Sequence, residues 1–168
     1  MQPRTLSAAL AVAAAALVAC GSGTKAPSGH FTAQLNGANE KPSPISTSGA
    51  GTADMTLDPT GTSVTWTITA TGLTGNATNA HIHIGDPTVA GPVIVDFKAI
   101  SPPPAGTSTT FSGTFTQTNI KNPTSPPLAT PIATMDQLIA AIRAGNAYFN
   151  IHTATNPGGE IRGQLSEQ

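Results

Sequence analysis

The sequence predicts an all-β domain, an antiparallel β-sandwich or barrel that carries one short helix. Three observations lead to this fold class. Apolar residues recur at every second position in about eight short segments, and turn residues such as Gly, Pro, Asn and Asp separate these segments. Only 9% of the residues are charged, so threonine must supply much of the solvated surface, which suits exposed strand faces.

The clearest strand pattern covers residues 62–72, where Val64, Trp66 and Ile68 share one face and threonines occupy the other. A further strand passes through Phe111 and Phe115. The same alternation defines the other predicted strands, which are residues 30–36, 51–58, 79–85, 92–98, 146–153 and 159–165.

One helix is predicted within residues 134–145. Thr134 at the N-cap and Gln137 three residues later can form a capping box, and Gly145 can adopt the left-handed conformation that ends a helix. The apolar side chains between them share one face, so we expect the helix to cover one end of the sandwich or a sheet edge.

Residues 1–19 have the features of a lipoprotein signal peptide. Arg4 makes the start positive, the alanine-rich apolar run after it is too short to span a bilayer, and Leu17-Val18-Ala19-Cys20 fits a bacterial lipobox. We expect Cys20 to receive the lipid and residues 20–29 to form a flexible tether. The alternative is an ordinary secreted protein whose signal peptide happens to contain a cysteine.

Charge and motif content exclude several functional classes. Removal of residues 1–19 takes one of the seven basic residues away, which leaves six against eight acidic residues and no basic patch for nucleic acid. The chain lacks a Gly-x-Ser-x-Gly elbow, a phosphate-binding loop and a carboxylate pair placed for acid–base catalysis, so no catalytic residue is assigned. We expect an exported protein, lipid-anchored at the outer membrane or cell surface, with an extracellular or periplasmic partner.

The segment NAHIHIG places His81 and His83 on one face of a strand, opposite its aliphatic residues. In NAYFNIHT, Tyr148, Asn150 and His152 likewise lie opposite the apolar face, so both strands carry their histidines on the outer face. If the two strands are neighbours, the three imidazoles converge, because cross-strand Cβ atoms lie about 5 Å apart. Imidazole is a favoured ligand of zinc and copper. The pattern therefore predicts a mononuclear copper or zinc site on His81, His83 and His152.

Two other interpretations of the histidines remain open. In the first, the cluster is structural, and the histidines fix turns or bond to Asn150 and Glu160. In the second, they take part in catalysis. If a metal binds, Glu160, Tyr148, His30 or water could complete its coordination.

The C-terminal segment GEIRGQL also alternates. Glu160 and Arg162 lie on its polar face, which we interpret as a solvated ladder that finishes the sheet. Arg162 could fork to a carboxylate, and Glu40 is the candidate partner. Gly163, inside the strand, predicts the close approach of a neighbouring chain segment or a bulge.

These motifs together resemble the CHRD domain, a module named from its repeats in the animal protein chordin and also found singly in bacterial exported proteins. The matching pieces are FTAQLNGANEKPSPISTSGAGTADMTLD, the Gly-Leu of residues 72–73, AHIHIG, a Gly-Pro-Val strand and AGNAYFNIHTATNPGGEIRGQL. They run from about His30 to Leu165, so residues 30–168 are predicted to form one CHRD-like domain.

The resemblance implies an immunoglobulin-like Greek-key sandwich, weakly similar to copper/zinc superoxide dismutases. A two-metal dismutase site needs about six histidines, whereas this chain has four, so a true dismutase is disfavoured. We expect a non-enzymatic binding or interaction module. The alternative is a mononuclear copper or zinc protein, and a dismutase-like redox enzyme is a distant third.

Overall fold

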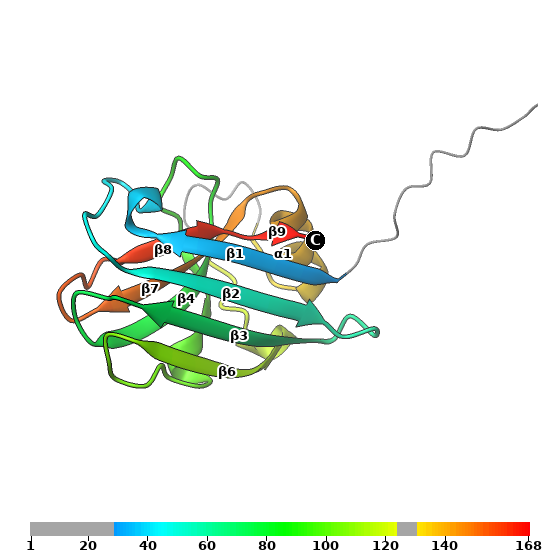
Figure 1. Cartoon of the computed structure of the whole chain (residues 1–168). Coiled ribbons are helices and arrows are strands. Elements are labelled where there is room, and N and C mark those ends of the chain that lie inside the picture. The colour runs from blue at the N-terminus through cyan, green and yellow to red at the C-terminus, as the bar shows by residue number, and fades with distance from the viewer. Residues whose placement is uncertain (1–28, 124–130) are drawn as a thin grey trace, which may run out of the picture.

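Figure 1 shows the computed structural model of the chain, which describes residues 29–123 and 131–168. The predicted signal peptide, Cys20 and nearly all of the tether lie outside these residues. Within the described ranges, no helix is long and apolar enough to cross a membrane.

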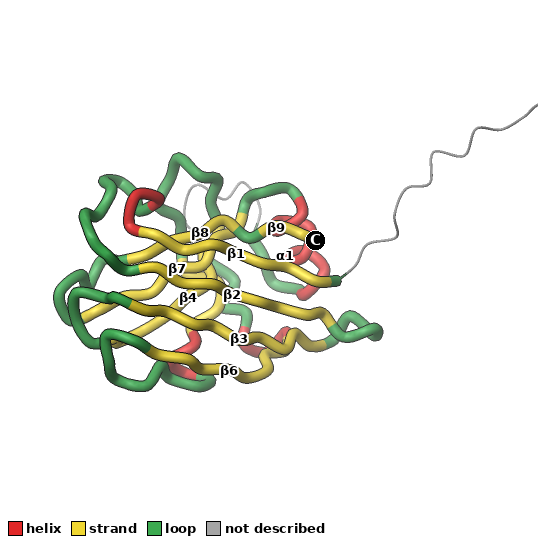
Figure 2. Tube along the Cα trace, in the orientation of Figure 1, coloured by secondary structure: helices red, strands yellow, loops and turns green. Residues whose placement is uncertain are grey.

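Antiparallel strands make up most of the domain (Figure 2). They are β1 (His30–Asn36), β2 (Ala50–Leu57), β3 (Ser63–Thr71), β4 (Ala77–Ile84), β5 (Val93–Asp96), β6 (Thr109–Thr116), β7 (Ala147–Thr153), β8 (Ile161–Gln164) and β9 (Ser166–Glu167). Three short 3-10 helices, η1 (Gly37–Asn39), η2 (Phe97–Ala99) and η3 (Gln117–Asn119), and one α-helix, α1 (Met135–Arg143), complete the described elements.

The strands form one continuous sheet in the order β5-β4-β7-β8-β1-β2-β3-β6, and β9 pairs with β1 beside this path. The sheet curls, so that β1, β2, β3 and β6 form a layer in front of β4 and β7 (Figure 1). The predicted all-β, sandwich-like fold with one helix is confirmed. The two layers are halves of a single curled sheet that are joined where β8 meets β1.

Aromatic side chains fill the space between the layers. Trp66 of β3 packs edge-on against Phe97 of η2, with 4.4 Å between ring centroids. Phe97 in turn lies 5.2 Å from Phe149 of β7, so one chain of ring contacts runs from layer to layer. All three side chains are buried, and the period-two pattern places Trp66 and Phe149 on the inner faces of their strands.

Helix α1 begins and ends where the sequence predicts. The Thr134 hydroxyl accepts from the Gln137 amide, the Gln137 side chain reaches back, and Gly145 follows the helix with φ 74°. The helix contacts β7 and β9, and Arg143 donates two hydrogen bonds to the Glu167 carboxylate at 3.0 and 3.1 Å. The helix packs on the sheet at β7 and β9, and its role stays the structural one that we expect from the sequence.

Strand β7 corrects one prediction about the sheet. Its apolar residues face the core as expected, but the opposite face is covered as well, since Tyr148 and Asn150 are both 3% exposed. The loop between β4 and β5 provides part of this cover: the Gly91 amide donates to the Tyr148 hydroxyl at 3.0 Å. The predicted outer face is therefore a second buried surface, and the polar residues on it need partners.

The interpretation of residues 159–165 as a solvated ladder is wrong for the same reason. Glu160 and Arg162 are 0% and 2% exposed, respectively. Gly163 does mark a close approach, as predicted, because the Gln34 carbonyl group of β1 lies against its α-carbon and leaves no room for a side chain.

Candidate functional site

Three histidines meet on the covered face of β4 and β7. These strands are antiparallel neighbours, with His81 opposite Asn150 and His83 opposite Tyr148. One ring nitrogen from each of His81, His83 and His152 lies within 4.8 Å of the other two. The predicted convergence is confirmed, since the register brings His152 of β7 diagonally next to His81.

The loop after β4 fixes the orientation of His83. Its Nδ1 lies 2.8 Å from the carbonyl oxygen of Gly91, and a carbonyl can only accept, so Nδ1 carries the hydrogen. Nε2 then holds the free lone pair, and this atom is buried without a hydrogen bond of good geometry among the described residues, although the Asn150 side chain lies near enough to His83 to raise its pKa. A buried acceptor without a partner is costly, so this nitrogen is an open ligand position.

The other two rings belong to one hydrogen-bonded chain. His152 Nδ1 donates to the Pro157 carbonyl at 2.9 Å, which leaves its Nε2 as an acceptor for His81 Nδ1, also at 2.9 Å. His81 Nε2 can then accept from the Asn79 amide nitrogen at 2.8 Å. Each donor in this series of hydrogen bonds, from Asn79 to the Pro157 carbonyl, has an acceptor. The carbonyl beyond His152 also turns its Nε2 toward the cluster.

All three rings are held in the neutral form that binds metals. Burial lowers the pKa of His81 to about 3, and the neighbouring His152 and His83 lower it further. Burial likewise lowers the pKa of His83 to about 4, against the opposing effect of the Gly91 carbonyl, and it lowers the pKa of His152. At neutral pH the cluster therefore presents uncharged imidazoles.

The donor set fits a copper or zinc ion. His83 offers an Nε2 lone pair, and His152 would offer the Nε2 lone pair that accepts from His81. In both rings the opposite nitrogen is fixed by a backbone carbonyl, an arrangement common around metal-bound imidazoles. His81 can offer Nδ1 if its proton moves to Nε2, where Asp96 Oδ1 lies 3.7 Å away, and the Asn79 amide group must then turn away from Nε2. Three nitrogen ligands leave a fourth position for water or another group.

Two of the predicted supporting residues lie elsewhere. The Glu160 carboxylate is fully used by hydrogen bonds from threonine and asparagine side chains and one backbone amide. His30, on β1, bonds to Asp54 at 2.8 Å and is not part of the cluster. Among the described residues, this leaves Tyr148 as the predicted neighbour that borders the histidines.

Tyr148 lies between His83 and Arg162. Its ring stacks on His83 with 4.9 Å between centroids and 5° between planes, and the Arg162 guanidinium carbon lies 3.4 Å from the ring centroid. The guanidinium forks to the backbone carbonyls of Val89 and Asp86, both at 2.8 Å, rather than to the predicted carboxylate. This stack joins the histidine cluster to β8.

Glu40 is close to Arg162 without an ion pair between them. Its carboxyl is 4% exposed, and burial raises its pKa to about 7 although the Arg162 charge and hydrogen bonding from Asn150 oppose the rise. Glu40 Oε1 and Asn150 Oδ1 are both buried without a hydrogen-bond partner among the described residues. Asn150 therefore links Glu40 to the histidine cluster, because its side chain acts on the pKa of both Glu40 and His83.

Sequence reasoning missed the backbone groups that orient the rings. Gly91 accepts from His83 and donates to Tyr148, and a side chain at this position would overlap the Ile84 carbonyl. The Gly-Pro-Val pattern was the only signal for it. No sequence pattern predicted that Pro157 contacts His152 or that Asp96 lies near His81. These contacts depend on the paths of loops and on a β-bulge between β4 and β5.

The fold and the site define a class: an all-β domain whose polar clusters are held under loops on a curled sheet. The model of the CHRD domain family matches residues 31–165, which is most of the chain. The chain therefore belongs to the CHRD domain family. A comparison with curated proteins finds no match.

Proposed function

We propose that this chain is an exported, lipid-anchored binding domain without catalytic activity, and that it binds one copper or zinc ion through His81, His83 and His152. One observation carries the metal proposal. His83 Nε2 is a buried lone pair without a hydrogen bond of good geometry among the described residues, and a ring nitrogen of His83 lies within 4.8 Å of ring nitrogens of His81 and His152. The other five ring nitrogens of the three histidines each have a hydrogen-bond partner, so His83 Nε2 is the ring nitrogen of this cluster that is open to a further ligand.

Calorimetric titration of the purified full-length chain with Zn²⁺ or Cu²⁺ tests this proposal. We expect one ion per chain with a Kd of about 1 μM or tighter. His83→Ala should weaken binding by about 100-fold, since even the loss of a group that only orients a ligand costs about 10- to 100-fold. His152→Ala, at a less buried position, should do the same and guards against a folding defect at position 83.

His30→Ala is the matched control, because it removes an imidazole that lies outside the cluster. Its affinity should equal that of the unchanged chain. Wild-type binding weaker than about 0.1 mM, or equal losses in all three variants, would rule out the histidine site.

The anchor proposal rests on the lipobox at residues 17–20. We expect Cys20→Ser to abolish labelling by radioactive palmitate in a bacterial host and to leave a precursor or a soluble form, because serine cannot form the thioether. Ser22→Cys in the same background is a control that restores a thiol two residues away, and it should not restore labelling. Palmitate incorporation by the Cys20→Ser chain would refute the lipobox.

A further inference from the structure

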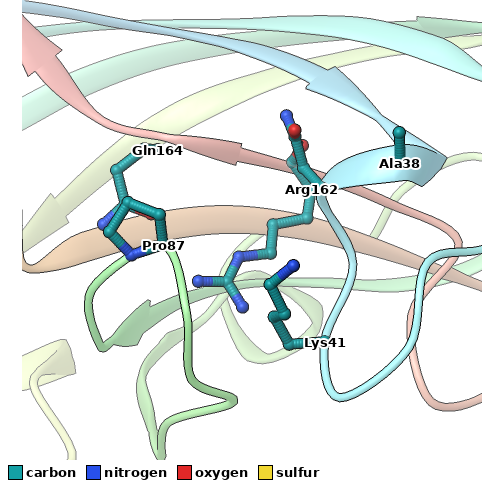
Figure 3. A pocket seen from close by; sticks show the side chains of 6 residues that line it. Ala38, Lys41, Pro87, Arg162 and Gln164 are labelled. Carbon is teal, nitrogen blue, oxygen red and sulfur yellow. The ribbon is translucent and has the colours of Figure 1, made fainter.

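A polar cavity lies beside Arg162, whose guanidinium group contacts the ring of Tyr148. Its volume is about 280 Å³, which is near the lower end for small-ligand pockets. It is lined by Ala38, Asn39, Lys41, Pro87, Arg162 and Gln164, which come from η1 and the chain after it, the loop between β4 and β5, and strand β8. Figure 3 shows the side chains of Arg162 and Lys41 at this cavity.

Arg162 brings a buried positive charge to the cavity wall. The residue is 2% exposed, and its two guanidinium bonds go to the neutral carbonyls of Val89 and Asp86. A guanidinium has five N–H donors, so about three remain after these two bonds. A buried cation normally needs an anionic partner, and none forms an ion pair with Arg162 among the described residues.

The local charge balance is positive. Lys41 also lines the cavity, and it has no ion pair within the described part of the chain. The Asp86 charge favours the charged form of Arg162 without an ion pair between the two residues. The Asp86 carboxylate instead accepts hydrogen bonds from the amide and hydroxyl of Thr88 at 2.7 and 2.6 Å. Burial keeps the pKa of the nearby Glu40 at about 7, so this carboxyl is mostly protonated in mildly acidic solution. Arg162 and Lys41 carry two positive charges and Asp86 carries one negative charge, so the cavity has a net charge of about +1.

We propose that this cavity binds a single carboxylate group, held by the free donors of Arg162 and the ammonium of Lys41. A carboxylate carries one negative charge and two acceptor oxygens, which matches the charge and the remaining donors of the cavity. The inference goes beyond the proposed metal function, because its residues are not part of the histidine cluster. The carboxylate belongs either to a small free acid or to the C-terminus of a peptide.

The test is an NMR titration of the ¹⁵N-labelled full-length chain in detergent at pH 6.5, in buffer freed of metal ions. Three probes are compared: sodium acetate, acetyl-trialanine with a free carboxylate, and the same peptide as its amide. We expect saturable binding of acetate with a Kd of about 1 to 10 mM, and the largest shift at the Arg162 Nε–H signal. Lys41→Gln should weaken binding at least about fivefold, since it removes one of the two cations.

Lys98→Gln is the matched control: it makes the same substitution at an exposed lysine outside the cavity. It should change the Kd by less than about twofold. Binding of the free peptide but not of its amide identifies a chain terminus as the ligand, whereas binding of acetate alone identifies a small acid. Equal weakening in both variants, or no saturation by about 50 mM acetate, would overturn the proposal. The metal titration has no bearing on this result.

Discussion

Replacement of Glu160 by Gln is expected to lower the free energy of unfolding by about 3 kcal/mol. The carboxylate accepts from Thr47 Oγ1 at 2.6 Å, Thr74 N at 2.7 Å, Thr74 Oγ1 at 2.9 Å, Thr153 Oγ1 at 2.6 Å and Asn156 Nδ2 at 3.2 Å. An amide turns one of its acceptors into a donor that faces other donors. Urea unfolding at pH 7, followed by Trp66 fluorescence, measures the loss.

Glu40→Gln is the matched comparison, because it makes the same change at another buried glutamate. Burial raises the pKa of Glu40 to about 7, so above that pH the folded chain holds a carboxylate that burial disfavours. At pH 8 we expect the amide to stabilise the fold by about 1 kcal/mol or more. A similar loss of stability in both variants would show that burial alone, and not the hydrogen bonding of Glu160, sets the outcome.

The two glutamates should also respond to pH in opposite directions. Burial raises the pKa of Glu160, but the hydrogen bonds from Thr153, Thr47 and Thr74 outweigh it and lower the pKa from 4.5 to about 2. Its stabilising contribution is complete above pH 4.5 and is lost as the pH falls toward 2. Glu40 has a raised pKa, so its contribution is present below pH 4.5 and is lost as the pH rises to about 7.

The difference in the free energy of unfolding between each variant and the unchanged chain isolates the effect of one glutamate. The three clustered histidines contribute equally to the pH dependence of both proteins, so their contribution cancels. The cost of Glu160→Gln should shrink from pH 5 to pH 3, and the gain from Glu40→Gln should grow from pH 5 to pH 8. Unfolding curves at pH 3, 5 and 8 provide the comparison. A pH-independent difference for either variant would contradict the assigned pKa direction.

Local pattern was enough to predict β1 to β8 and the helix, whereas the two-residue strand β9 was not predicted. Alternation places Val64, Trp66 and Ile68 on the buried face of β3, and the capping box at Thr134 starts α1, because these signals depend only on near neighbours. The convergence of the histidines followed from one assumption, that β4 and β7 pair, and the fold satisfies it.

What covers a sheet face cannot be read from the strand itself. Strand β8 alternates like a half-exposed strand, yet Arg162 is buried because the loop between β4 and β5 folds over it and supplies carbonyls from Asp86 and Val89. The same loop supplies Gly91 to His83. These contacts join residues more than 70 positions apart, or depend on a turn whose path no local signal gives.

Gly163→Ala is expected to lower the free energy of unfolding by about 3 kcal/mol, near the upper end for overpacking. A β-carbon at this position would lie 2.7 Å from the Gln34 carbonyl carbon, which is backbone and cannot rotate away. Gly163 lies where β8 meets β1, so relief of the clash must open the pairing of these two strands, which joins the two halves of the sheet. Urea unfolding measures the change. Gly158→Ala is the control, because its β-carbon would meet nothing within 4 Å, and an equal loss there would show that neighbouring backbone is not the cause.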